Sequence, residues 1–296
     1  MPDVAGTSQA RIDVRKTYKL FIGGAFPRSE SGRTFHVTSA KGYFLANAAQ
    51  ASRKDAREAV AAARTARYGW AGATSYNRGQ VLYRIAEMLE GRRAQCATEV
   101  SAADGISYDA ALEQVNLTVD RWVWYAGWTD KISAVLGSTN SVAGPYLNIT
   151  TPEPVGVVAA IAPTSPSLLA LVSVLAPIVA AGATCVCVVT GAAALPAMSF
   201  AEVLATSDLP EGVINLLTGF APEIAPWLAS HEDVDLLDLS GCDDPTLAID
   251  LERAAAEHLA RIVRPVGVAY DWSSDPGLSR IRPMVELKTV WHPMGI

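Results

Sequence analysis

A thiol at the start of a helix is the best candidate for a nucleophile in this sequence. Cys242 comes just before a helix predicted over 245–261, and the helix dipole would lower the pKa of its thiol. Asp243 and Asp244 oppose that effect, and no histidine lies nearby in the sequence to act as a base. We therefore expect no reactive thiolate. The other cysteines lie within predicted elements: Cys96 on a helix, Cys185 and Cys187 alternating along a buried strand.

The histidines show no spacing that points to chemistry. No pair has the separation typical of metal ligands, and no serine, histidine and aspartate form a convincing triad. We expect neither a catalytic residue nor a metal site. Surface or hydrogen-bonded positions are the simpler interpretation of His36, His231, His258 and His292.

The elements that would position any site are organised around a charge-free segment, residues 154–201. It begins with a β-branched, apolar run, and after two prolines a helical stretch ends at Ala181 before Ala183–Val189 is again strand-like. Continuous apolar strands joined by a helix indicate a parallel sheet buried on both faces. A membrane span over Leu168–Val189 is the competing interpretation, but Pro177 and Gly182 interrupt it and no basic residues flank it.

Helices and strands alternate on both sides of this segment. Before it, we predict two strands within Tyr18–Val37 and helices following Ser52, over 77–100 and over 108–132. After it, a helix (198–207), a strand (213–218), a helix (222–230), a strand (234–239) and the helix over 245–261 complete a doubly wound domain. The aromatic residues of the third N-terminal helix are expected in the core rather than on a ligand platform: Trp122, Trp124, Tyr125 and Trp128.

Composition excludes several classes of function. The 24 basic and 30 acidic side chains give a net charge of -6 without a block of one sign, so nucleic-acid binding has no electrostatic footprint. There is no CxxC pair and no signal-peptide pattern, which fits a reduced, cytoplasmic protein. The mean hydropathy of +0.20 exceeds that of an average domain and suggests surface reserved for a partner.

A dinucleotide site needs a carboxylate at the end of the second strand, where it binds the ribose. That strand ends at Val188 and Val189, followed by Thr190 and Gly191, and the next acidic residue is Glu202. We therefore expect the ribose contact to be missing.

Several segments in a fixed order carry a resemblance to a known family: KLFIGGAF, AVAAARTA, YAGWTDKI, PEPVGVVAAIAP, LPEGVINLLTG, HEDVDLLDLSG and VELKTVWHP. The chain resembles the aldehyde dehydrogenase superfamily from about Tyr18 to Val263 and again over its last dozen residues. The resemblance implies an α/β fold: a doubly wound, Rossmann-type parallel sheet with N-terminal helices and an oligomerisation β-arm.

The resemblance also implies which pocket positions have lost their polar groups. A lysine and a glutamate would stand just after the second strand, where this chain has Val188, Thr190 and Gly191. The oxyanion-stabilising asparagine aligns with Ser165, which we interpret instead as the cap of a helix beginning at Pro166.

The second anion site of the family lies at the helix after VDLLDLSG. By resemblance, Ser240, Gly241 and Cys242 would bind the phosphate there, but Asp244 in the same turn repels it. The family's second glycine falls at Thr246. We therefore expect no bound cofactor, or NAD or NADP only if the chain is an enzyme after all.

The family's nucleophilic cysteine and water-activating glutamate lie, by resemblance, in a domain beyond about Val263. Here a linker of about twenty residues takes that place, which is too short for a domain. The predicted divisions are a disordered tail (1–16), the strand and helical part of a cofactor-type domain (17–145), a Rossmann-type core (146–263), the linker (264–283) and a C-terminal oligomerisation strand (284–296).

The family's oligomerisation arm is retained. Tyr146–Ile149 and Met284–Trp291 match the two strands that pair with a neighbouring subunit in the family. Main-chain pairing of an edge strand is a common way to bind another protein. The residues expected on or beside the interface are Leu147, Ile149, Val285, Leu287, Val290 and Trp291.

The leading hypothesis is a non-catalytic, aldehyde-dehydrogenase-like subunit that docks on a catalytically complete aldehyde dehydrogenase and stabilises or regulates it. A minimal NAD(P)-dependent aldehyde oxidoreductase is the alternative, and a self-assembling structural scaffold is a further one. The expected partner is a full-length dehydrogenase subunit or another copy of the chain, with neither nucleic acid nor a membrane.

Overall fold

Five parallel strands form the centre of the computed structural model, which describes residues 16–267 and 269–295. The sheet has the order β10-β9-β6-β7-β8, and every residue of the four strands β6 to β9 is buried. This confirms the Rossmann-type parallel sheet. Apart from Lys16, the tail expected to be disordered lies outside the described residues. The strands are β6 (Val157–Ile161), β7 (Thr184–Val189), β8 (Ile214–Thr218), β9 (Leu236–Asp238) and β10 (Arg261–Val263).

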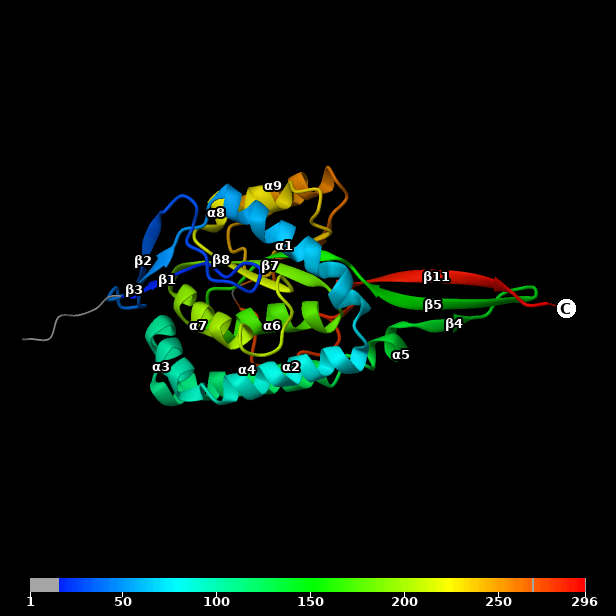
Figure 1. The fold of residues 1–296 in the computed structure, drawn as a ribbon, viewed down its shortest axis with the longest axis horizontal. Helices are drawn as coiled ribbons and strands as arrows, with labels where there is room; N and C mark the ends of the chain where they lie inside the picture. Colours follow the sequence, from blue (N-terminus) through cyan, green and yellow to red (C-terminus); the bar gives the residue numbers. More distant parts are fainter. Residues whose placement is uncertain (1–15, 268, 296) are drawn as a thin grey trace, which may run out of the picture.

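One face of this sheet is covered by a single layer of helices and the other face by two layers (Figure 1). One face is covered by α1 (Arg53–Gly72), α8 (Ala221–Ala229) and α9 (Pro245–Ala256). The other is covered by α6 (Ser167–Ala180) and α7 (Ala194–Leu204), with α2 (Ser75–Glu90), α3 (Arg93–Asp104) and α4 (Tyr108–Ala126) as a further layer.

The charge-free helix α6 is buried at every residue, because the sheet lies on one side of it and α4 on the other. That position explains why the helix tolerates no charge. In α4, Trp122 and Tyr125 are fully buried, and Trp124 and, just beyond the helix, Trp128 pack against the same core, as predicted. Within the described ranges, none of the helices has the length and hydropathy required to cross a bilayer.

The helix ends depend on caps more than on hydrophobic periodicity. Ser52 and Asp55 form a reciprocal capping box that starts α1. The single helix predicted over 77–100 is two helices, because α2 ends at Gly91. The helix predicted to Ile132 ends at Ala126, and α5 (Ile132–Leu136) is a separate short helix.

A small sheet lies beside the N-terminal end of α1 and was only partly foreseen. Its order is β1-β3-β2, formed by β1 (Thr17–Tyr18), β2 (Thr34–Thr38) and β3 (Phe44–Ala49). The strands β3 and β10 were not predicted. The strand β10 has only three residues, and β3 has the alanine-rich sequence FLANAA, so neither carries a strong strand signal.

Between β10 and the arm, residues 269–283 are folded against the body rather than extended. Trp272 and Ile281 are buried in the core beside α4 and α6. Arg121 of α4 donates to the carbonyl oxygens of Trp272 (2.8 Å) and Ser274 (3.1 Å). The predicted linker is therefore a structural part of the body.

Arg280 fixes the end of this segment. Its guanidinium is 6% exposed and donates to the Asp238 carboxylate (3.1 Å), the Ser240 hydroxyl (3.0 Å) and the Ser173 carbonyl (3.1 Å). The partners come from the end of β9, from the turn that follows it and from α6. One buried cation thus joins three parts of the body at the carboxyl end of the sheet.

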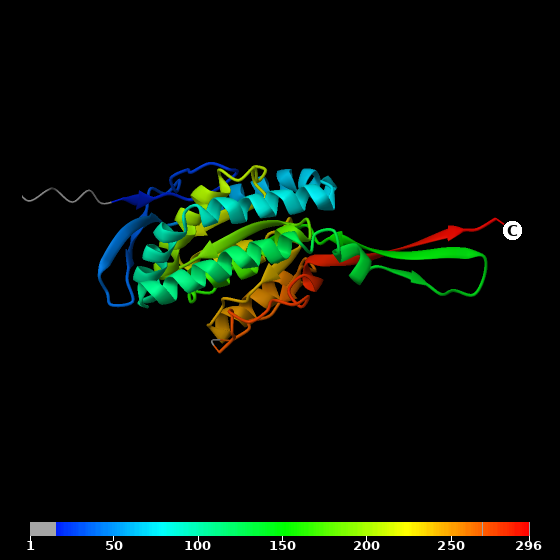
Figure 2. The same ribbon diagram turned by 90° about the horizontal axis from the view of Figure 1, so that it is seen from below.

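The arm extends from one end of the body (Figures 1 and 2). Strands β5 (Tyr146–Pro154) and β11 (Val285–Pro293) pair antiparallel along all nine residues of each. A short strand, β4 (Ser138–Asn140), pairs with the other side of β5. The order β11-β5-β4 makes β11 an edge strand.

We expect Arg280→Ala to lower the free energy of unfolding by roughly 3–5 kcal/mol, because the Asp238 carboxylate would stay buried without its counter-ion. Urea denaturation followed by circular dichroism measures the change. Arg282→Ala is the matched control, since the exposed Arg282 side chain makes no hydrogen bond or ion pair with the described residues. Its effect should stay within about 0.5 kcal/mol. Equal effects of the two substitutions would contradict the role given to Arg280.

Candidate functional site

The crevice where a Rossmann-type sheet binds its ligand lies outside the carboxyl ends of β6 and β9, where the chain connections diverge. At this point Gly241 lies directly against the loop after β6. A Cβ at Gly241 would come within 2.2 Å of the Ala162 carbonyl carbon, and the Gly241 N–H donates to the Ile161 carbonyl (3.1 Å). The glycine serves close packing here, and its N–H is already used.

The first turn of α9, the family's phosphate site by resemblance, holds a carboxylate of the chain itself. The Asp244 side chain accepts from the N–H groups of Thr246 (2.9 Å) and Leu247 (3.3 Å). These are the donors that a bound anion would need. An anion at this helix would therefore have to displace Asp244 and overcome its charge.

The N-terminus of α6 is also capped by a carboxylate, and the prediction that Ser165 is the cap is wrong. Ser165 is exposed, and the residue before the helix is Pro166, which makes no side-chain cap. Instead both oxygens of Asp104, at the end of α3, accept from the Ser167 N–H (3.1 and 3.3 Å). The sequence gives no local sign of this contact, because the two residues are far apart along the chain.

The end of β7 offers no group for a ribose. Val188 is fully buried, Thr190 is half-buried and Gly191 has no side chain. The first carboxylate beyond them, Glu202, lies on α7, where it accepts from Lys16 (3.2 Å) and Arg92 (3.2 Å). It is already engaged in ion pairs on the surface.

All four thiols are buried. Burial raises the pKa of the Cys242 thiol, and the nearby Asp244 and Asp243 add to the effect, in the direction opposite to that of the helix dipole. Its Sγ lies 3.5 Å from the Asp244 carbonyl oxygen. Burial likewise raises the pKa of Cys96 to about 12 and that of Cys185 and Cys187 well above the usual range. The described residues include no cluster of three side chains able to hold a metal ion.

The arm is the second candidate site, and the direction of its hydrogen bonds can be assigned. Just beyond the two ends of the β5–β11 pair, Val155 donates to the Met284 carbonyl (3.0 Å) and Met294 donates to the Pro145 carbonyl (2.8 Å). Because the bonding direction alternates along a strand, the even-numbered residues of β11 face β5. The odd-numbered residues therefore direct their N–H and C=O groups away from β5.

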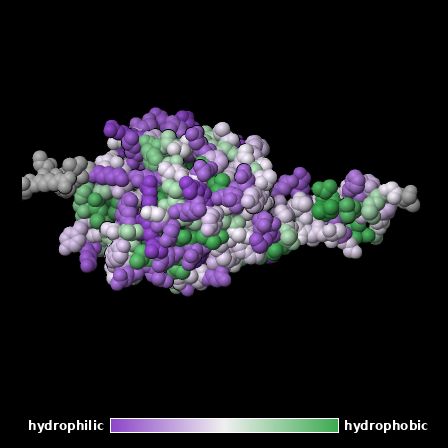
Figure 3. Space-filling view, turned by 60° about the horizontal axis from the view of Figure 1, so that its bottom comes forward, coloured by the Kyte–Doolittle hydropathy of each residue, from purple (hydrophilic) through white to green (hydrophobic). Residues whose placement is uncertain are grey.

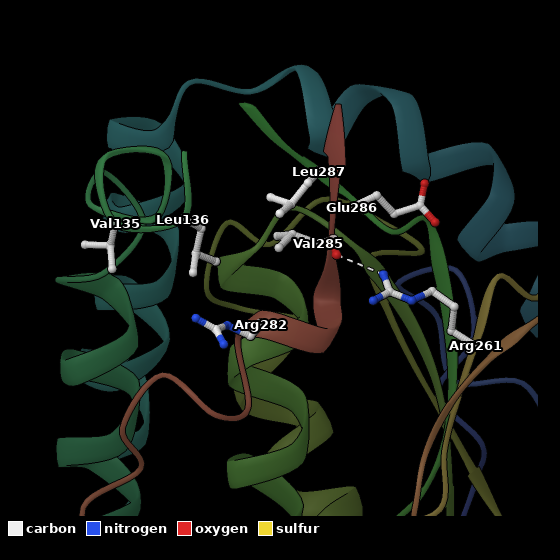
Figure 4. A pocket seen from close by; sticks show the side chains of 7 residues that line it. All are labelled: Val135, Leu136, Arg261, Arg282, Val285, Glu286 and Leu287. Atoms are coloured by element: carbon white, nitrogen blue, oxygen red, sulfur yellow. Dashed lines mark hydrogen bonds between the residues drawn. The ribbon is translucent and has the colours of Figure 1, made fainter. Parts of the chain in front are cut away.

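The outward edge of β11 is open only in the middle. On the body side, Arg261 Nη1 donates to the Val285 carbonyl (2.8 Å), which occupies the first outward acceptor (Figure 4). At the tip, Pro293 has no N–H. Leu287, Thr289 and Trp291 have both of their main-chain groups open, and no further strand of the described chain covers them.

Apolar side chains lie on both faces of the arm. Figure 3 shows apolar surface on the side of the arm that is in view. Leu147, Ile149 and Val290 lie on one face, as their places in the register require, and all are exposed. Leu287 and Trp291 lie on the other, 61% and 58% exposed.

One of the six predicted interface residues, Val285, differs from the rest. Its side chain is 5% exposed at the root of the arm, and it belongs to the hydrophobic core. The root is fixed by the body, and only the outer part of the arm is available to a partner.

A cavity of about 690 Å³ lies at the root of the arm (Figure 4). In Figure 4, Leu136 of α5 faces Val285 and Leu287, with the Arg282 guanidinium below them. The remaining lining residues are Val135, Arg261 and Glu286. The open edge of β11 thus begins beside a hollow lined by apolar side chains, two arginines and one glutamate.

The profile of the aldehyde dehydrogenase family matches residues 26–268. Cytosolic 10-formyltetrahydrofolate dehydrogenase of Mus musculus is 30% identical over 236 residues, which are 78% of this chain and 26% of that protein. Putative aldehyde dehydrogenase DhaS of Bacillus subtilis (strain 168) is 30% identical over 265 residues, 88% of this chain and 52% of that protein. The chain therefore spans about half, or less, of the length of these relatives.

A solved structure with the same fold is the NAD+ complex of aldehyde dehydrogenase from Bacillus cereus. It shares 31% identity with this chain, with a TM-score of 0.78, over 83% of this chain and 50% of that one. The Rossmann-type architecture of the described residues is thus that of a nucleotide-binding relative.

Asp104 should give the α6 cap a pH signature. Burial raises the pKa of its carboxyl above the ordinary 3.8, and the hydrogen bonds from Ser167 oppose this only in part. A raised pKa means that the folded protein binds the proton more tightly, so this contribution to stability is present at low pH and is lost as the pH rises through the raised value. We expect Asp104→Asn to remove that loss, because an amide oxygen still accepts from Ser167 but does not ionise.

Urea denaturation of wild type and variant from about pH 4 to about pH 7 tests this expectation. Asp120→Asn, which changes an exposed carboxylate on α4, is the control and should leave the wild-type profile unchanged. Parallel stability profiles for wild type and Asp104→Asn would contradict the assignment.

Proposed function

Because the chain belongs to the aldehyde dehydrogenase family, we propose that it is a non-catalytic subunit that associates with a full-length aldehyde dehydrogenase and stabilises or regulates it. The open edge of β11 is the observation that carries this proposal. Unpaired edge strands favour association with another chain, and natural proteins usually cover or interrupt them. This edge instead keeps exposed apolar side chains on both of its faces.

The state of the thiols supports a non-catalytic role. Oxidation of an aldehyde through a covalent intermediate needs a thiolate that reaches the substrate. The four thiols are buried, and burial raises the pKa of each. Residues 264–283 lead from β10 directly to the arm, where the resemblance places the family's catalytic domain.

The state of the nucleotide crevice supports the same role. Asp244 and Asp104 each accept from the first turn of a helix at the carboxyl end of the sheet, so both helix N-termini already have an acceptor. Val188 and Thr190 provide no charged group beside them. These features favour a role in binding another protein over a role in catalysis.

A relative with an intact catalytic domain is the partner that this surface fits best. The arm is the part of the family architecture that serves contacts between subunits, by resemblance, and this chain keeps it with nine paired residues per strand. Addition of a partner strand to β11 would use the main-chain groups of Leu287, Thr289 and Trp291. Leu147, Ile149 and Val290 would be covered on one face of the extended sheet.

Thr289→Pro tests this role of the edge. The substitution removes an outward N–H and leaves the main-chain bonds to β5 intact, because Thr289 does not bond to β5 through its main chain. It also removes the Thr289 hydroxyl, which lies 3.0 Å from the Thr150 hydroxyl of β5. We expect tagged wild-type chain to co-purify from its native cell with an aldehyde dehydrogenase, identified by mass spectrometry at fixed stoichiometry, and Thr289→Pro to reduce that recovery at least about tenfold.

Thr289→Ala is the matched control, because it removes the same side chain and keeps the N–H; it should bind like wild type. Circular dichroism of the three proteins establishes that each is folded. Absence of any dehydrogenase from the wild-type eluate, or equal recovery with Thr289→Pro, would overturn the proposal.

Nucleotide titration separates this role from that of a minimal NAD(P)-dependent oxidoreductase. With both helix N-termini capped by carboxylates, we expect NAD and NADP to bind no more tightly than about 1 mM in calorimetry. A full-length dehydrogenase measured in parallel is the positive control. A micromolar Kd for the isolated chain would favour the enzyme instead.

A further inference from the structure

We propose that the open edge of β11 also pairs with β11 of a second copy of this chain, in one antiparallel register centred on Thr289. The contact uses the same edge as the proposed function but requires no dehydrogenase. It would join the two arms into one continuous sheet with a two-fold axis at Thr289.

The hydrogen-bonding direction restricts the register. Only odd-numbered residues of β11 have outward main-chain groups, so an odd residue of one copy must lie opposite an odd residue of the other. Near the middle of the strand, this leaves pairings centred on Lys288, Thr289 or Val290. The side chains distinguish among the three.

The two neighbouring registers are unfavourable. Centring on Lys288 places that ammonium group directly opposite its own copy, and like charges in opposed positions destabilise a sheet. Centring on Val290 places Lys288 opposite His292 and gives Leu287 a proline, Pro293, as its main-chain partner. That proline cannot donate to Leu287.

Centring on Thr289 matches apolar with apolar side chains. Leu287 lies opposite Trp291 of the second copy, on both sides of the axis. These are the two most exposed of the predicted interface residues, at 61% and 58%. Trp291 already contacts the Tyr146 ring, with centroids 5.8 Å apart, so the added leucine would complete an apolar cluster on this face.

The same register also gives Glu286 a partner. Within its own arm Glu286 lies opposite Glu153, while Lys288 pairs with Glu153 at 3.1 Å. In the described part of the chain Glu286 makes no ion pair. In the register centred on Thr289 it lies opposite His292 of the second copy, whose ring N–H can donate to the carboxylate.

The ends of the paired region agree with this register as well. Val285 would lie opposite Pro293 of the second copy, which has no N–H for the Val285 carbonyl. Arg261 Nη1 already donates to that carbonyl at 2.8 Å, so no acceptor is left unsatisfied there (Figure 4). Between these ends, three odd-numbered pairs would exchange about six main-chain hydrogen bonds.

The shape of the molecule allows the contact. The arm projects from one end of the body, with the start of β11 at the body and its end at the tip (Figure 1). Antiparallel pairing therefore places the two bodies at opposite ends of the shared sheet. Since each copy uses its β11 edge once, the assembly closes as a dimer, unlike a self-assembling scaffold.

Disulfide trapping tests the register. In the proposed pairing, the Thr289 Cα atoms lie about 5.5 Å apart across the axis, within the range that a disulfide spans. The native thiols are buried, so a Thr289→Cys variant adds an exposed thiol to a chain without one in its described part. We expect mild oxidation of purified Thr289→Cys to give a covalent dimer at least about tenfold faster than Lys288→Cys or Val290→Cys.

Light scattering of the purified wild-type chain should give about twice the 31.3 kDa chain mass at high concentration, and Thr289→Pro should give the single-chain mass. Faster trapping through Lys288→Cys or Val290→Cys would assign a different register and overturn the proposal. A monomeric wild type that no variant traps would also overturn it. Neither result would touch the proposed function, which is tested by recovery of a dehydrogenase.

Discussion

The buried ion pair between Arg280 and Asp238 determines where the chain leaves the body and therefore where the arm stands. Buried charges are tolerated only when their partners and hydrogen bonds are complete, and here Asp238 also accepts from the Ser240 N–H at 2.9 Å. A few residues after Arg280, β11 begins at Val285, paired with Pro154. Since β5 leads directly into the central strand β6, both strands of the arm are anchored in the core. The edge of β11 is consequently presented at a fixed position.

The body keeps a nucleotide fold without the groups that would bind a nucleotide. The parallel sheet is held by apolar packing, which does not depend on any ligand, so the architecture can outlast its polar site. Gly241 illustrates that one glycine can serve either close packing or phosphate binding. Its missing Cβ is required by the close approach of Ala162, whether or not a phosphate binds. A retained glycine is therefore evidence of packing before it is evidence of a cofactor.

Local patterns allowed the sheet and its helices to be predicted, while contacts between distant residues did not follow from them. The strands β6 and β7 and the helix α6 were predictable, because a continuous apolar run has few places in a folded protein. Helix ends were less predictable: the helix predicted over 77–100 is interrupted at Gly91. The cap of α6 was assigned to Ser165 because it is adjacent, yet Asp104 supplies it from another helix. The same holds for Arg280, whose partner lies on β9.

The arm illustrates a further limit. Its existence followed from a resemblance, but which residues face outward depends on the register between β5 and β11, and the residues of β11 do not alternate cleanly between polar and apolar. Pro152 and Pro154, which cannot donate, lie opposite Leu287 and Val285, where β5 needs no donor. The positions of these prolines therefore indicate which residues of β5 and β11 direct their main-chain groups away from each other. It can be interpreted only after the pairing is known.

The short length of the open edge bears on how firmly any strand can bind there. A main-chain hydrogen bond contributes about 1 kcal/mol net, so three outward residues contribute only a few kcal/mol before the apolar side chains are counted. Association costs at least about 4 kcal/mol in lost translational and rotational freedom. Arg261 at the root and Pro293 at the tip prevent the ladder from growing, which protects against open-ended aggregation. An edge of this strength favours an exchangeable contact, in which one strand can be displaced by another that covers Leu287 and Trp291 more completely.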